Sequence, residues 1–198
     1  IRDSNKIKVV FIENYDVSKA ELIIPAADVS EQISTTTKEA SGTGNMKLMM
    51  NGAITLATLD GANIEIFDQV GEDNIVIFGL SANEVLNYNK FGGYSALDLY
   101  NSNRVIKRVV DDLVNGFIPN MEKEGRQIYD SLITYNDEYF VLRDMENYIE
   151  AQEKIDRLYK NKEKWNEMAL INIANSGVFS SDRTIAEYAE DIWFKGCE

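Results

Sequence analysis

The segment Glu39-Ala-Ser-Gly-Thr-Gly-Asn-Met-Lys47 places a tight turn of small residues shortly before an amine. Residues Ser41–Gly44 form the turn, and residues 45–50 read as a helix. Backbone amides at a helix start lack partners within the helix, and the helix dipole adds partial positive charge, so a phosphate group fits there. The glycines let the backbone approach an anion closely, and Thr43 adds a hydroxyl donor. Since Lys47 lies about 5 Å beyond the turn, the spacing suits pyridoxal phosphate, which carries both a phosphate and an aldehyde.

Each part of this interpretation has a plainer alternative. Loops with two glycines are common, and the dinucleotide-binding fingerprint needs a third glycine where this chain has Lys47. A lysine on a helix is most often a solvated surface charge. The surrounding residues are apolar, however: Met46, Leu48, Met49 and Met50. We therefore expect Lys47 to lie in a dry environment, where a free ammonium is costly and covalent attachment to an aldehyde removes the cost.

The segment resembles the cofactor-lysine signature of the α-glucan phosphorylases, the family of glycogen, starch and maltodextrin enzymes. Other motifs resemble that family in the same order and spacing, and the likeness extends from about Lys8 to Trp193. These motifs are Glu13-Asn-Tyr15, Ile24-Pro-Ala-Ala-Asp28, Ser30-Glu-Gln-Ile-Ser34, Asp60-Gly-Ala-Asn-Ile-Glu65, Asn172-Ile-Ala-Asn-Ser-Gly177 and Phe179-Ser-Ser-Asp-Arg-Thr-Ile185.

The resemblance implies roles for individual residues. In the family the signature lysine carries pyridoxal phosphate as an imine, and Lys47 matches it. Thr43 and Gly44 match positions beside the cofactor phosphate, and Tyr15 matches a tyrosine beside the cofactor. The segment that contacts the glucose at the cleavage site is matched by four residues: Glu39, Ala40, Ser41 and Gly42. In the family, the glutamate of this segment accepts hydrogen bonds from a sugar hydroxyl. On the residues alone, Tyr15 also suits aromatic packing at a strand end, and Glu39 also suits capping of the turn that follows.

The family reaction is the reversible phosphorolysis of a terminal α-1,4 bond, which gives glucose 1-phosphate with retained configuration. The implied partners are the α-1,4-glucan, inorganic phosphate and glucose 1-phosphate. The phosphate of the cofactor, rather than its imine, supports proton donation to the glycosidic oxygen, which is general acid catalysis with electrostatic stabilisation. The resemblance also implies that the full-length protein is a homodimer in the cytoplasm.

This chain departs from the family pattern in its charged groups. The basic residues that neutralise the two adjacent phosphates, and a histidine near the sugar, come from an earlier part of the family's chain that is absent here. Asp16 puts an anion next to Tyr15, near the expected phosphate site. Two phosphates that face each other without cations repel strongly. Because the chain begins at Ile1, we expect it to be a piece of a longer phosphorylase. Because the cations are missing, we expect this piece alone to be inactive.

Two rival functions remain open. One is a glycogen-synthase-like sugar transferase, which would use the same kind of sheet and glutamate with a nucleotide sugar and no cofactor lysine. The other is a binding module that holds a glucan or a phosphorylated ligand without turnover. A pyridoxal-dependent aminotransferase is disfavoured, because the surrounding motifs resemble phosphorylases throughout.

Composition limits the remaining function classes. A length of 198 residues with 44% hydrophobic and 27% charged residues is typical of a globular domain with its own core. A formal net charge of −13 argues against nucleic-acid binding, which needs a basic surface. No apolar run approaches the roughly 20 residues of a membrane-spanning helix. The single cysteine, Cys197, fits a reducing compartment, and the absence of histidine removes the commonest metal ligand, so no metal site is predicted.

The pattern of the chain predicts the α/β class, with a mostly parallel sheet and a helical C-terminal end. Apolar and β-branched runs predict strands at residues 6–12, 28–34, 54–58 and 74–78. Apolar periodicity and caps predict helices at residues 17–22, 45–50, 62–70, 144–159, 164–174 and 182–193. A capping box at residues 81–84 predicts the start of another helix, and the spacing of apolar residues predicts one from about residue 95 to residue 116. By resemblance, residues 1–198 are the C-terminal part of a cofactor-binding, Rossmann-like domain of the GT-B type. Its α/β part is 1–94, its mainly helical part is 95–198, and the N-terminal domain is absent.

Overall fold

The computed structural model describes residues 7–195 of the chain, so Ile1, Lys6 and Cys197 lie outside the described part. Its centre is a sheet of three strands in the order β1–β2–β3, and both pairs are parallel. The strands are β1 (Val29–Gln32), β2 (Ile54–Ala57) and β3 (Val76–Ile77). The predicted α/β class with a parallel sheet is therefore confirmed, although each strand is shorter than its apolar run.

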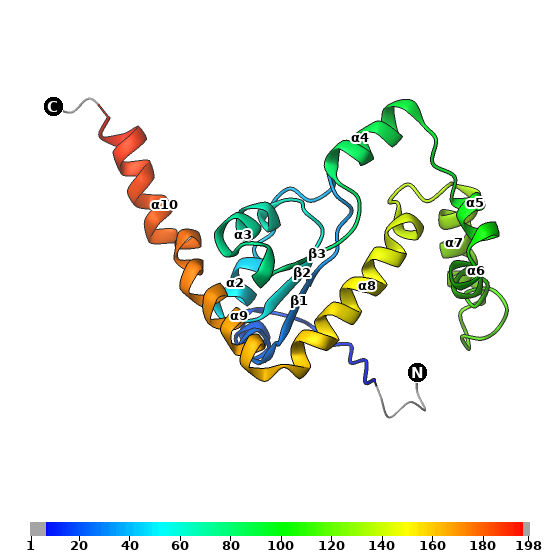
Figure 1. The fold of residues 1–198 in the computed structure, drawn as a ribbon, viewed down its shortest axis with the longest axis horizontal. Helices are drawn as coiled ribbons and strands as arrows, with labels where there is room; N and C mark the ends of the chain where they lie inside the picture. Colours follow the sequence, from blue (N-terminus) through cyan, green and yellow to red (C-terminus); the bar gives the residue numbers. More distant parts are fainter. Residues whose placement is uncertain (1–6, 196–198) are drawn as a thin grey trace.

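Parallel neighbours cannot be joined by a tight hairpin, so each pair needs a crossover connection. Helix α2 (Gly44–Met50) connects β1 to β2, and helix α3 (Ala62–Val70) connects β2 to β3, as Figure 1 shows. Both helices were predicted within one residue of these bounds. The loop that leads into α2 follows directly from the carboxyl end of β1, which is where open α/β sheets place ligands.

Helices cover both faces of the sheet because its side chains alternate between the two faces. On one face, Leu56 of β2 and Val76 of β3 pack with Ile155 of the long helix α8 (Val141–Lys160). On the other face, Ile77 packs with the cluster of α2 and α3, which includes Met49. Helix α9 (Lys162–Asn175) contributes to both clusters and closes the lower end of the sheet in Figure 1.

The remaining helices lie outside this central layer (Figure 1). They are α1 (Val17–Ile23), α4 (Ala82–Phe91), α5 (Ala96–Ser102), α6 (Arg104–Asp111), α7 (Glu122–Tyr129) and α10 (Ser181–Tyr188), with short 3-10 turns at Ile24–Ala26, Glu72–Asn74 and Ser176–Phe179 and π-helical turns at Asp130–Thr134 and Ala189–Trp193. The capping box at the start of α4 is confirmed, since Ser81 and Glu84 satisfy each other's backbone amides. Helix α7 was not predicted.

The region from residue 95 to residue 116 forms two helices instead of the single predicted one. The break falls at Asn103, whose side-chain oxygen accepts hydrogen bonds from Val105 N at 2.9 Å and Ile106 N at 3.2 Å. Asparagine competes for nearby backbone donors in this way and so favours a helix start over a helix interior. Helices α5 and α6 then share a small core of their own, in which Tyr100 and Val110 are buried.

The predicted strand at residues 6–12 is wrong over its described part, residues 7–12. These residues have no regular secondary structure, and the side chains of Val9 and Phe11 are 71% and 90% exposed. A strand forms only where a neighbouring backbone pairs with it. Within residues 7–195 the sheet consists of β1, β2 and β3, and none of them pairs with this run. Its sequence therefore has the composition of a buried strand without the neighbour that would bury it.

Within residues 7–195, no helix combines the length and the apolar character needed to cross a bilayer.

Two apolar residues on α9 test the packing of this helix against the sheet. We expect Met168→Ala to lower the free energy of unfolding by about 2–5 kcal/mol, because Met168 is fully buried among sheet residues and truncation leaves a cavity. Leu170→Ala is the matched control: Leu170 is 66% exposed, so its loss should stay within about 0.5 kcal/mol. Urea unfolding followed by circular dichroism measures both values, and equal losses would contradict the assigned buried face of α9.

Candidate functional site

The loop between β1 and α2, residues 33–43, is anchored on the turn that follows β2. Thr58 Oγ1 donates a hydrogen bond to the carbonyl oxygen of Ser34 at 2.6 Å. The backbone amide of Glu39 donates to Asp60 Oδ2 at 2.8 Å. The register pairs the last residues of β1 and β2, so the chain segments after both strands emerge side by side. The loop that carries the predicted substrate residues is therefore held by its sheet neighbour.

Gly61 brings the two segments into backbone contact. Its φ angle is +52°, and a Cβ atom there would lie 2.8 Å from the carbonyl oxygen of Ser41 and 3.0 Å from Glu39 Cγ. The next residue, Ala62, donates its amide proton to the same Ser41 oxygen at 2.9 Å. Only glycine satisfies both the left-handed backbone and this close approach.

A buried pair of amide side chains joins the start of α2 to the start of α3. Asn45 Nδ2 donates to Asn63 Oδ1 at 2.9 Å, and Asn63 Nδ2 donates to the carbonyl oxygen of Thr58 at 3.2 Å. Asn45 and Asn63 are 1% and 3% exposed, so their polar groups need these partners. The sequence analysis did not assign a role to either asparagine. The motif Asp60–Glu65 contains Asn63 and could have indicated its role, but it was used only as part of the family resemblance.

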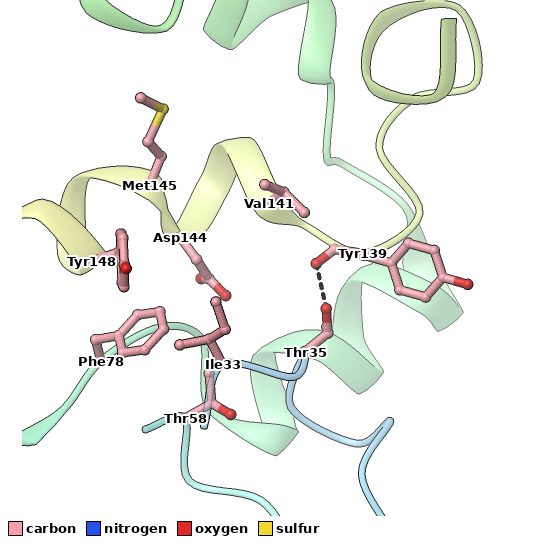
Figure 2. A pocket seen from close by; sticks show the side chains of 9 residues that line it. All are labelled: Ile33, Thr35, Thr58, Phe78, Tyr139, Val141, Asp144, Met145 and Tyr148. Carbon is pink, nitrogen blue, oxygen red and sulfur yellow. Dashed lines mark hydrogen bonds between the residues drawn. The ribbon is translucent and has the colours of Figure 1, made fainter. Parts of the chain in front are cut away.

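The other side of the loop is bonded to the segments that lead into α4 and α8. Thr36 is fully buried, and its hydroxyl donates to the carbonyl oxygen of Leu80 at 2.8 Å. Thr35 Oγ1 donates to the carbonyl oxygen of Tyr139 at 2.7 Å, which is the dashed line in Figure 2. The loop is thus fixed from both sides, which favours a preorganised binding site.

The predicted substrate residues lie together on this loop. Glu39 is half-buried, and its Oε2 accepts a hydrogen bond from Ser34 Oγ at 3.0 Å. Ala40 and Ser41 are exposed, and Gly42 has a φ angle of +84°. The loop therefore presents one oriented carboxylate, flanked by an accessible backbone.

Lys47 is exposed, so the expectation of a dry environment is wrong for this structure. Helix α2 buries Asn45 and Met49, which are four residues apart and so lie on one face. Lys47 is two residues from each of them and points away, on the face that it shares with Gly44. The apolar residues next to Lys47 in the sequence do not bury it, because a helix distributes successive side chains over all its sides. Met50, for example, is 46% exposed.

The exposed face of α2 is open at its N-terminus. A Cβ atom at Gly44 would meet no heavy atom within 4 Å, and the hydroxyl of Thr43 makes no capping hydrogen bond to the helix. The amides of Gly44 and Asn45 and the Thr43 hydroxyl therefore face space that a phosphate group can enter, whereas the Met46 amide already donates to Asn45 Oδ1 at 2.9 Å. Lys47 stands on the same side, one turn further along.

Lys47 borders a groove of about 370 Å³ between α2 and α1. The groove is also lined by Val17 and Glu21 of α1 and by Pro25, which follows that helix. Tyr15 precedes α1 and is 60% exposed, but it does not line the groove. The structure thus places Lys47 beside α1 and Tyr15 in the segment just before this helix.

Asp16, the anion that departs from the family pattern, has a local role. Its Oδ1 accepts the backbone amide proton of Lys19 at 2.9 Å, so it is the N-cap of α1. A carboxylate at this position also interacts favourably with the helix dipole. The residue therefore stabilises the start of α1 next to the groove that borders Lys47.

Comparisons with known proteins agree on one family. A family model described as carbohydrate phosphorylase matches residues 2–195. Glycogen phosphorylase of Bacillus subtilis is 59% identical over 187 residues, which is 94% of this chain and 23% of the relative. The liver form of human glycogen phosphorylase is 48% identical over 189 residues, and the rat muscle form is 46% identical over 189 residues; each match covers 96% of this chain and 22% of the relative. The chain thus spans less than a quarter of these relatives.

Substitution of Gly61 tests the contact between the two segments. We expect Gly61→Ala to destabilise the protein by more than the strain of its backbone angle alone, about 1–3 kcal/mol, because the new methyl group meets Ser41 and Glu39. Gly71→Ala is the matched control, since Gly71 has a φ angle of +74° but no heavy atom within 4 Å of the new Cβ position.

Urea unfolding gives the two stabilities, and amide exchange reports on the loop around Glu39. Only the Gly61 variant should lose protection at the Glu39 amide, which donates to Asp60. The same effect of both variants on stability and exchange would show that the close approach does not hold the loop.

Proposed function

The chain belongs to the carbohydrate phosphorylase family, and we propose that it is a segment of an α-1,4-glucan phosphorylase. The proposed reaction moves a terminal glucosyl unit of the glucan onto inorganic phosphate and yields glucose 1-phosphate. The observation that carries this proposal is the segment Glu39–Lys47, in which an oriented carboxylate, an open helix start and an exposed lysine follow one another on an anchored loop.

We further propose that residues 1–198 are the C-terminal part of a Rossmann-like, cofactor-binding domain of the GT-B type, with an α/β part at 1–94 and a mainly helical part at 95–198. The parallel order of β1, β2 and β3 supports a doubly covered α/β sheet. The match to less than a quarter of each relative supports a larger parent protein that contains further domains.

The residues of the open face fit pyridoxal phosphate. We propose that the amides at the start of α2, near Gly44, and the Thr43 hydroxyl hold the phosphate, while Lys47 binds covalently and Tyr15 lies beside the ring. The fit rests on the space beside Gly44 and on the shared exposed face of Gly44 and Lys47. When bound, the cofactor would supply a phosphate group that supports proton donation to the leaving oxygen.

The loop residues Glu39, Ala40, Ser41 and Gly42 are the proposed glucose site. The carboxylate of Glu39 would accept a hydrogen bond from a sugar hydroxyl, and the backbone beside it would offer further polar contacts. Ser34 already orients this carboxylate, and Asp60 fixes the backbone amide of the same residue. Such preorganisation lowers the cost of ordering the site when the sugar binds.

We propose that residues 1–198 alone have no turnover. Two phosphates must approach each other in the reaction, and their repulsion requires local cations. The chain has a net charge of −13. Lys38 belongs to the loop, but its Nζ atom lies 3.8 Å from Oε1 of Glu138 and is thus already paired with an anion. The parent protein therefore has to supply cations from outside this chain.

Replacement of Lys47 in the full-length parent tests the cofactor assignment. We expect Lys47→Ala to abolish covalent cofactor binding and phosphorolysis, because Lys47 is the one lysine of helix α2. Lys90→Ala is the control, since Lys90 lies in the last turn of α4 and should leave both properties unchanged. Absorbance, mass spectrometry after borohydride reduction and glucose 1-phosphate release from maltodextrin measure the effects.

The outcomes also separate the rival functions. A colourless parent that uses a nucleotide sugar would be a synthase-like transferase. A parent that binds glucan without forming glucose 1-phosphate would be a binding module.

Replacement of Glu39 tests the sugar site. We expect Glu39→Gln in the parent to lower kcat/KM for phosphorolysis by about 10- to 100-fold, the effect of losing a hydrogen bond to a charged group. Covalent cofactor binding should remain intact, because Glu39 is not among the residues proposed to hold it. Glu138→Gln, at the carboxylate near Lys38, is the matched control and should keep nearly full activity. Unchanged kcat/KM in the Glu39 variant would remove this residue from the site.

A further inference from the structure

A second concave site lies at the carboxyl ends of the three strands. It has a volume of about 230 Å³ and is shown in Figure 2. Its floor comes from the residues that directly follow β1, β2 and β3, namely Ile33, Thr58 and Phe78. Its opposite wall comes from the first turns of α8. The carboxyl ends of parallel strands are where α/β sheets bind ligands, and the first residues of the loop between β1 and α2 also line this cavity.

Most of the lining is apolar and includes aromatic rings. Phe78 and Tyr148 face each other with ring centroids 5.2 Å apart and planes tilted by 57°. Ile33 and Val141 complete the apolar wall. An apolar cavity of about 150 Å³ holds benzene in a well-studied protein. The cavity here, at about 230 Å³, is thus large enough for one substituted ring.

One buried carboxylate interrupts this apolar surface. Asp144 belongs to the first turn of α8 and is 8% exposed, and Figure 2 shows its carboxylate directed toward the strand ends and Ile33. Its Oδ1 accepts the amide proton of Leu80 at 2.9 Å. A Cβ atom at Gly79 would lie 2.9 Å from Oδ2, so glycine leaves the room that this oxygen occupies.

No side-chain cation forms an ion pair with this carboxylate within the described part of the chain. None of the ion pairs found among residues 7–195 includes Asp144. The charge of the adjacent Arg143 lowers the pKa of Asp144, but this guanidinium also interacts with Tyr88 and Glu84 and forms no ion pair with Asp144. Burial raises the pKa of Asp144 above its usual range, since its ionised form lacks sufficient compensation. A cation inside the cavity would supply that compensation.

We propose that this cavity binds a small arylalkyl amine, whose nitrogen is separated from the ring by a saturated carbon, with its ammonium group at the Asp144 carboxylate and its ring against Phe78 and Tyr148. The buried carboxylate selects for positive charge, because an ammonium forms a charge-assisted hydrogen bond that a neutral ligand cannot match. The apolar wall selects for a ring over a hydrated ion. The residues that line this cavity differ from those proposed for the phosphorylase chemistry, and the present proposal does not depend on that chemistry.

Calorimetric titration of the 198-residue chain with benzylamine and with benzyl alcohol tests the proposal. The two ligands have similar shapes, but only benzylamine is protonated at neutral pH. We expect benzylamine to bind at least about tenfold more tightly than benzyl alcohol. Equal affinities, or no detectable binding of benzylamine at millimolar concentration, would overturn the proposal.

Two variants identify the groups responsible, after circular dichroism has verified their folding. Asp144→Asn keeps an oxygen that can accept the Leu80 amide proton, and it should reduce benzylamine affinity to that of benzyl alcohol. Glu150→Gln is the matched control on the same helix and should bind benzylamine as the parent chain does.

Val141→Trp fills the cavity without changing the carboxylate and should abolish binding of both ligands. This variant keeps the proposal testable if the Asp144 variant does not fold. Benzylamine binding that is unchanged in Val141→Trp, or in a folded Asp144→Asn variant, would overturn the proposed site.

Discussion

The close approach of two chain segments at Gly61 is the constraint on which the candidate site depends. Strands β1 and β2 are parallel and in register, so the chain after each strand leaves the sheet at the same edge. The segment after β2 then bonds to the segment after β1 through Thr58, Asp60 and Ala62. A side chain at residue 61 would separate them. The sheet therefore helps to determine the conformation of the candidate loop, which does not depend on the loop sequence alone.

This dependence couples the motif around Asp60 to the lysine segment. Asp60 fixes the backbone of Glu39, and Asn63 fixes Asn45 at the start of α2. The carboxylate and the open helix start are therefore held by neighbouring residues of one turn. A change in that turn would move the proposed sugar and phosphate sites together, which links two parts of the proposed chemistry through the same few hydrogen bonds.

Local signals predicted much of the fold. The Ser81–Glu84 capping box, the helix at residues 62–70 and the parallel order of the strands all follow from interactions between residues close in sequence or from strand–helix alternation. The failures are non-local. The run at residues 7–12 has the composition of a strand, but pairing depends on a neighbour that the run itself does not encode. Lys47 appeared dry from its apolar neighbours, whereas the buried face of α2 is decided by what packs against Asn45 and Met49.

The same limit applies to the two candidate sites, the segment Glu39–Lys47 and the cavity around Asp144. The first site could be recognised in the sequence from its motif of glycines and a lysine, because the residues of this motif are adjacent in the chain. The cavity around Asp144 joins residues that follow three different strands to a helix more than sixty positions further on, as the Leu80–Asp144 bond illustrates with a separation of 64 residues. No local pattern marks Asp144 as unusual, since an acidic residue in the first turn of a helix is common. Only the packing of α8 over the strand ends turns this ordinary residue into a buried carboxyl group without an ion pair.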